Sequence, residues 1–69
     1  MFASLIEKIQ ECEFACFNTI EIMDDILYLY CEPSSDYKIF KEVVLINELV
    51  DAGVFSVNYL DNSIKIKCK

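Results

Sequence analysis

The chain has no histidine, no arginine and no tryptophan, and it has a single glycine among its 69 residues. Without histidine it lacks the side chain that ordinarily acts as a general base near neutral pH, and with it any Ser-His or Cys-His pair. Without arginine it lacks the usual bidentate clamp for phosphate or carboxylate groups. One glycine cannot form a glycine-rich phosphate loop. These absences predict a protein that is not an enzyme and binds no cofactor.

Asp24 and Asp25 form an adjacent pair of carboxylates, the group that general acid–base chemistry often uses. The alternative is a solvated turn, because turns favour aspartate and no neighbouring side chain would remove these carboxylates from water. The sequence favours the turn.

Long apolar runs are also absent, and no stretch of 18 apolar residues could span a membrane. No basic residue precedes Glu7, so the N-terminus does not resemble a secretory signal, and the expected compartment is the cytoplasm. The hydrophobic content is nevertheless 55%. A chain this short buries only about 60% of its unfolded surface, so the excess apolar surface predicts a protein partner or a homodimer.

What the chain does contain is a repeat. A shift of 37 residues, without a gap, places Met23–Glu32 over Leu60–Lys69. Each copy has the pattern of a helix followed by a β-hairpin. The predicted fold is therefore α+β, an α-β-β-α-β-β pseudo-repeat in which a four-stranded antiparallel sheet has two helices packed on one face. It forms one domain, 1–69, with repeat-like halves 1–32 and 38–69 and a linker over 33–37.

The first helix is predicted from Ala3 to Cys16, with a capping box at Ser4 and Glu7 and a stop at Asn18. A two-residue turn at Asp24-Asp25 then forms the first hairpin. Its inward pairs are Ile22 with Leu27 and Ile20 with Leu29. Its outward side chains are those of Thr19, Glu21, Met23, Ile26, Tyr28 and Tyr30.

The second helix is predicted to begin after an N-cap at Asp36 and to run through Ala52, with Gly53 as its C-terminal cap. It is apolar nearly all round, which predicts burial on more than one side. The second hairpin turns at Asp61-Asn62. Its inward pairs are Tyr59 with Ile64, Val57 with Ile66 and Phe55 with Cys68, and its outer face carries mainly lysine.

Four cysteines leave three alternatives open: Cys12, Cys16, Cys31 and Cys68. Structural zinc sites usually use C-x₂-C pairs on turns, whereas the nearest pair here is C-x₃-C within the first predicted helix. A disulfide between Cys31 and Cys68, at equivalent strand ends, is opposed by a reducing cytoplasm. The sequence favours no metal site and reduced cysteines that serve as small core residues.

The net charge of −6 opposes general nucleic-acid binding, which depends on cationic contacts with phosphates. The charge is uneven, since residues 1–37 carry −7 and residues 38–69 carry +1. The segment Ile39–Lys69 resembles the C-terminal part of a winged-helix DNA-binding domain, which implies a basic wing at Lys65, Lys67 and Lys69. Its helix is mostly apolar and no short helix precedes it, so a water-facing lysine strand is the favoured alternative.

The outer face of the first hairpin is the candidate binding surface. Tyrosine and methionine are enriched at protein interfaces, and an acidic rim around an apolar centre suits a basic partner. The alternatives are that this face is covered within the chain or that its tyrosines are tolerated at the surface. The predicted partner-binding residues are Glu21, Met23, Asp24, Asp25, Ile26, Tyr28 and Tyr30.

The sequence supports three hypotheses for function. The first is a small acidic binding module for a protein with a basic surface. In length and charge the chain is similar to small acidic inhibitors from phages and mobile elements, including anti-CRISPR proteins and DNA mimics, which implies occlusion of a host protein's nucleic-acid-binding site. The second is a structural homodimer formed through the first hairpin or the second helix. The third is weak nucleic-acid binding through the C-terminal lysine strand.

Overall fold

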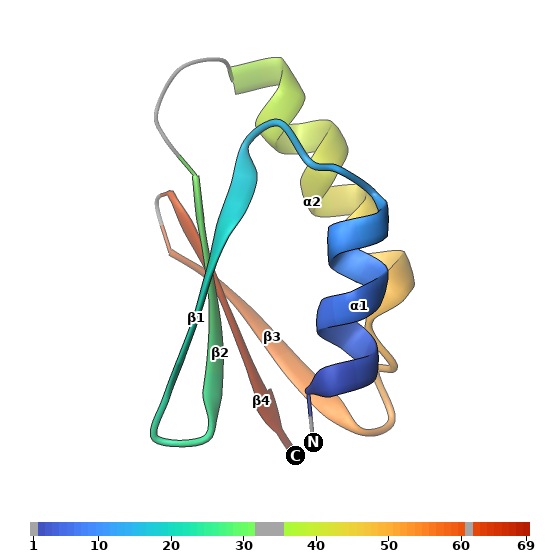
Figure 1. Ribbon diagram of the computed structural model, residues 1–69, viewed down its shortest axis with the longest axis vertical. Coiled ribbons are helices and arrows are strands. Elements are labelled where there is room, and N and C mark those ends of the chain that lie inside the picture. The colour runs from blue at the N-terminus through green and yellow to red at the C-terminus, as the bar shows by residue number, and fades with distance from the viewer. Residues whose placement is uncertain (1, 32–35, 61) are drawn as a thin grey trace.

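The computed structural model describes residues 2–31, 36–60 and 62–69, with the backbone alone for residues 36–39. The predicted α+β fold and its element order are confirmed. The elements are α1 (Ala3–Glu11), β1 (Phe17–Met23), β2 (Ile26–Cys31), α2 (Asp36–Leu49), β3 (Phe55–Leu60) and β4 (Ser63–Cys68). The strands form one antiparallel sheet in the order β1-β2-β4-β3, and both helices lie on the same side of it (Figure 1).

The pairing between β2 and β4 obeys the 37-residue shift found in the sequence. The two central inward pairs are Leu27–Ile66 and Leu29–Ile64. The shift exchanges these pairs, so the hairpins are related by an approximate two-fold axis that passes through the pair Tyr28–Lys65. All four inward side chains have 0% exposed surface and form the centre of the core.

The first hairpin turns at Asp24 and Asp25 as predicted, with the predicted inward register on both sides. Both aspartates have a positive φ, 51° and 61°, which a type I′ turn requires at its two central positions. The second hairpin also has its predicted register, from Phe55 opposite Cys68 to Leu60 opposite Ser63. Its turn residue Asp61 lies outside the described residues.

The turn makes a prediction about stability. Asp25→Gly is expected to raise the free energy of unfolding by about 0.5–1 kcal/mol, because glycine adopts the left-handed conformation without the steric cost that aspartate bears. Asp25→Ala is the matched control and is expected to lower stability. Thermal unfolding followed by circular dichroism measures both. A glycine variant less stable than the parent protein would contradict the assigned turn conformation.

The first helix is shorter than predicted, since α1 ends at Glu11 rather than Cys16. Its N-cap residue is Phe2, which makes no side-chain capping bond, so the predicted capping box is wrong. Glu13 has a φ of 50° and turns the chain out of the helical path. The reason is that Phe14 and Cys16 reach the core from the connection that follows and Phe17 reaches it from the start of β1, which a continued helix would not allow. Asn18, the predicted helix stop, lies in β1.

The carboxylate of Glu42 holds this connection in place. It projects from α2, is only 8% exposed, and accepts hydrogen bonds from three successive backbone amides. The N–H of Ala15 donates to Oε2 at 2.9 Å, and those of Cys16 and Phe17 donate to Oε1 at 3.1 Å each. Backbone amides that leave water without a partner are costly, so this carboxylate makes the buried path from α1 to β1 possible.

The second helix ends at Leu49, before the predicted Ala52, and Gly53 does not have the positive φ of a helix cap. Asp51 forms the turn instead. Its side-chain Oδ1 accepts from the Gly53 amide at 2.9 Å, and its carbonyl accepts from Val54 and Phe55. An aspartate that bonds to a backbone amide two residues on replaces the left-handed glycine as the turn device. The helix begins at Asp36, inside the predicted linker, and the predicted capping by the Asp36 side chain lies outside the described side chains.

The prediction that the second helix is buried on more than one side is wrong. Ile46 is fully buried and Val50 nearly so, but Phe40 is 73% exposed, and Val44 and Leu45 are exposed as well. The helix has one face on the core and one apolar face on the surface, because the described elements pack against one side of it.

The cysteines divide between core and surface. Cys16 and Cys31 are buried, whereas Cys12 and Cys68 are exposed, so the prediction of core cysteines holds for two of them. The sheet register rules out a disulfide between Cys31 and Cys68 within the chain. The Cys31 N–H donates to the backbone carbonyl of Asn62, just before the start of β4. Cys68 lies at the other end of β4, six residues or roughly 20 Å from Asn62. Disulfides need Cα atoms within about 7 Å.

Candidate functional site

The candidate site is the outer face of the sheet, opposite the helices. No described element covers it (Figure 1). Because side chains alternate along a strand, the residues between the buried positions all point to this side. The outer face consists of Thr19, Glu21 and Met23 from β1, Ile26, Tyr28 and Tyr30 from β2, Ser63, Lys65 and Lys67 from β4, and Ser56, Asn58 and Leu60 from β3.

Aromatic and apolar side chains occupy β2. The rings of Tyr28 and Tyr30 stack with their centroids 6.0 Å apart and their planes within 7° of parallel. Both rings and Ile26 are half-buried, and the neighbouring Met23 is 45% exposed. The stacked pair therefore leaves part of its aromatic surface exposed on the outer face, where a partner could contact it.

The structure brings five of the seven predicted site residues onto this surface: Glu21, Met23, Ile26, Tyr28 and Tyr30. Asp24 and Asp25 lie beside it in the hairpin turn at one end of the sheet. The predicted cluster is thus continuous in space, with its carboxylates along β1 and the turn.

Sequence reasoning placed the lysines on a separate hairpin face and missed their position beside the tyrosines. The register sets Lys65 directly opposite Tyr28 and Lys67 opposite Ile26. Each cross-strand row therefore runs from β1 through β2 to β4, and the central row reads Glu21, Tyr28, Lys65. The apolar centre therefore does not have an acidic rim on both sides, because Glu21 borders it on β1 and Lys65 and Lys67 border it on β4.

This environment affects the Tyr30 phenol. Loss of solvent around the ring raises its pKa above the ordinary value of 10.0, and the charges of Glu21 and Tyr28 raise it further. Since the unfolded chain would ionise first, the folded state loses stability as the pH rises through 10 and is unaffected below it. Tyr30 is therefore a neutral hydrogen-bonding group at physiological pH.

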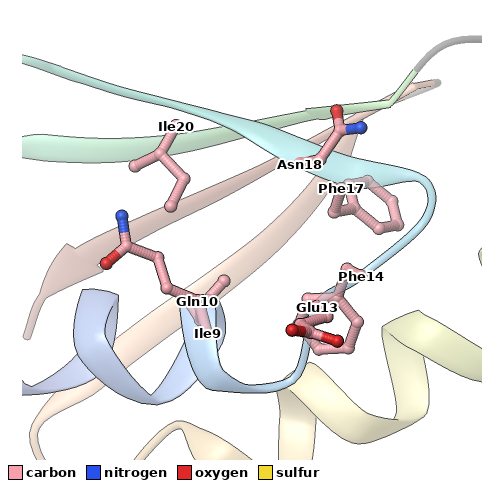
Figure 2. A pocket seen from close by; sticks show the side chains of 7 residues that line it. All are labelled: Ile9, Gln10, Glu13, Phe14, Phe17, Asn18 and Ile20. Atoms are coloured by element: carbon pink, nitrogen blue, oxygen red, sulfur yellow. The ribbon is translucent and has the colours of Figure 1, made fainter.

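Shallow hollows lie elsewhere on the described part of the molecule, and one of about 270 Å³ includes Cys12, Lys41 and Glu42 in its lining. One hollow of about 180 Å³ lies between α1 and β1, where Ile20 projects from the strand toward Ile9 and Gln10 of the helix (Figure 2). Its other lining residues are Glu13, Phe14, Phe17 and Asn18. Among the residues that the structure describes, no group of three or more cysteine, aspartate or glutamate side chains could hold a metal ion.

No family model, curated protein or solved structure matches the chain. In the described part of the chain, neither helix has the length and apolar character needed to cross a membrane.

Proposed function

We propose that this chain is a small non-enzymatic protein-binding module and that the outer face of the sheet is its working surface. The observation that carries the proposal is the stacked pair Tyr28–Tyr30, half-buried at the centre of a face that no described element covers. A water-facing sheet in a monomer usually carries short polar side chains. Tyrosine side chains near the centre of an interface are typical of binding-energy hot spots.

The acidic edge of this surface indicates the chemistry of the partner. Glu21, Asp24 and Asp25 lie along β1 and its turn, in a chain whose net charge is −6. They suit a cytoplasmic partner with a basic surface, and electrostatic attraction would speed its association. A host protein's nucleic-acid-binding site has that character, so occlusion of such a site, as by an inhibitor from a phage or mobile element, is the form of the proposal that the charge favours.

Capture from host extract with surface variants tests this proposal. The parent chain, Tyr28→Ala and the control Glu48→Ala, an exposed position on α2, are immobilised in parallel. We expect a protein retained by the parent and the control but reduced at least about tenfold by Tyr28→Ala, which removes a hot-spot side chain. Added salt or duplex DNA should release it. Equal retention by all three chains would show that the working surface is elsewhere.

A direct nucleic-acid assay tests the third hypothesis, weak nucleic-acid binding through the lysines of β4. The parent chain is expected not to shift duplex DNA or RNA at low salt, because Glu21 lies in the same row as Lys65 and the net charge repels phosphates. A shift that is lost on Lys65→Ala would contradict the proposal and favour nucleic-acid binding.

A further inference from the structure

The charges of the outer face are arranged in a self-complementary order. In the central row Glu21 on β1 and Lys65 on β4 flank Tyr28 of β2 on opposite sides. At the end of the sheet the acids lie in the turn, because the outward residue of β1 there is Met23. There the turn residues Asp24 and Asp25 follow β1, while β4 carries Lys67 next to Ile26. β2 thus separates Glu21 from Lys65 and Lys67.

We propose that, in the absence of another partner, a second copy of this chain covers the outer face through a two-fold axis that runs along β2. This inference rests on the proposed function, since it names an occupant of the same surface. The axis would stack each β2 on the β2 of the other copy and place each β1 over the other copy's β4. Glu21 would then face Lys65 of the partner subunit, and Lys65 would face Glu21 of the partner subunit.

The direction of the axis follows from the charges. A two-fold axis in the plane of the sheet but perpendicular to the strands would place β1 over the other copy's β1. Glu21 would then face Glu21 of the partner subunit. Like charges in direct opposition disfavour a complex. The axis along β2 instead forms both opposite-charge contacts at once and brings Tyr28 and Tyr30 together at the centre. Aligned packing of two sheets, with a crossing angle near 30°, is compatible with this arrangement.

These charges are available for contacts between copies. Within the described residues, Glu21, Lys65 and Lys67 form no ion pair with one another.

The area of contact between the two copies bears on the strength of the dimer. With the axis along β2, the strands of each copy that overlap are β1, β2 and β4. At a spacing of about 4.8 Å and a length of about six residues, they present a surface of roughly 10 by 17 Å, which is small for a permanent interface. The expected dimer is therefore weak, sensitive to salt and easily displaced by a better partner.

Reciprocal charge reversal tests the inference by sedimentation equilibrium. The parent chain is expected to dimerise reversibly at low salt and less at high salt. Glu21→Lys and Lys65→Glu alone should each weaken the dimer at least about tenfold, because both contacts become repulsive. An equimolar mixture of the two variants should dimerise again, since each contact then joins opposite charges. The double variant, which keeps the net charge of the parent, should also dimerise.

Other results would overturn the inference. A parent chain that stays monomeric at high concentration and low salt would do so, as would single variants that dimerise like the parent. So would a dimer abolished by Phe40→Asp and unaffected by Glu21→Lys, which would place the interface on α2. A monomer that still retains an extract protein through Tyr28 removes this inference and leaves the proposed function standing. A parent chain that dimerises as expected, but whose Tyr28→Ala variant retains the same extract proteins as the parent, supports this inference and removes the proposed function.

Discussion

Replacing Glu42 with alanine is expected to lower the free energy of unfolding by about 3 kcal/mol. The carboxylate accepts from the amides of Ala15, Cys16 and Phe17, and the latter two residues are buried. Its removal leaves these donors without an acceptor, and a hydrogen bond to a charged group contributes about 1.5–3 kcal/mol. Urea denaturation measures the change. Because total stability for this length is roughly 3–10 kcal/mol, the variant should be only marginally folded.

Glu48→Ala is the matched control, since it removes an exposed glutamate from the same helix. Its expected effect is within about 0.5 kcal/mol. Glu42→Gln separates charge from shape. The amide keeps one acceptor oxygen but sets an N–H₂ group against backbone donors, so we expect it to be destabilised nearly as much as the alanine variant. If Glu42→Ala unfolds at the same urea concentration as the parent, the role assigned to this carboxylate is wrong.

Leu29→Ala and Ile66→Ala are expected to destabilise the protein by about 3 kcal/mol each. Both side chains are fully buried at the centre of the sheet, and the 37-residue shift relates one position to the other. Truncation of either removes apolar contacts and leaves a cavity in a core that cannot collapse easily. The near equality of the two effects is the specific expectation, because each residue fills the same place in its half of the fold.

The control for these substitutions is Ile22→Ala. Ile22 lies on the same inward face of the sheet, but it is 51% exposed at the edge strand β1. Its expected cost is below about 1 kcal/mol. A large effect at Ile22, or a threefold difference between the two central positions, would contradict the description of the core as two equivalent halves around an axis.

The hairpins were predictable because their signals are local. Alternation of apolar and polar residues fixed which side chains point inward, and Asp24-Asp25 marked the first turn, so the register followed without tertiary information. The 37-residue shift then predicted that both halves contribute to one sheet. The structure bears this out in the β2–β4 pairing, which the same shift maps onto itself.

The end of α1 was not predictable because a distant residue determines it. Helical periodicity continues through Cys16, yet the chain leaves the helix after Glu11. The backbone amides of Ala15 to Phe17, which follow this early helix end, donate to Glu42, 25 to 27 positions further along the sequence. The second helix contains two glutamates, Glu42 and Glu48, and only the tertiary arrangement shows that Glu42 is the buried one that binds these amides.

Only part of the candidate site could be predicted from the sequence, because the rest depends on contacts between distant segments. Outward alternation along the first hairpin identified Tyr28, Tyr30 and Glu21, and the structure places them on one uncovered surface. The lysines of β4 depend on strand order, which no local pattern specifies. Their position beside the tyrosines changes the interpretation from an acidic surface to a surface of two opposite charges, and it is the basis for expecting self-association.

A dilution series followed by two-dimensional NMR tests directly whether the outer face is the interaction surface. As dimers dissociate, we expect concentration-dependent shifts for the amides of Glu21, Tyr28 and Lys65, while those of Val44 and Glu48 on α2 stay constant. Addition of a captured partner should perturb the same strand residues. Shifts confined to α2, in either experiment, would contradict the assignment of the outer face.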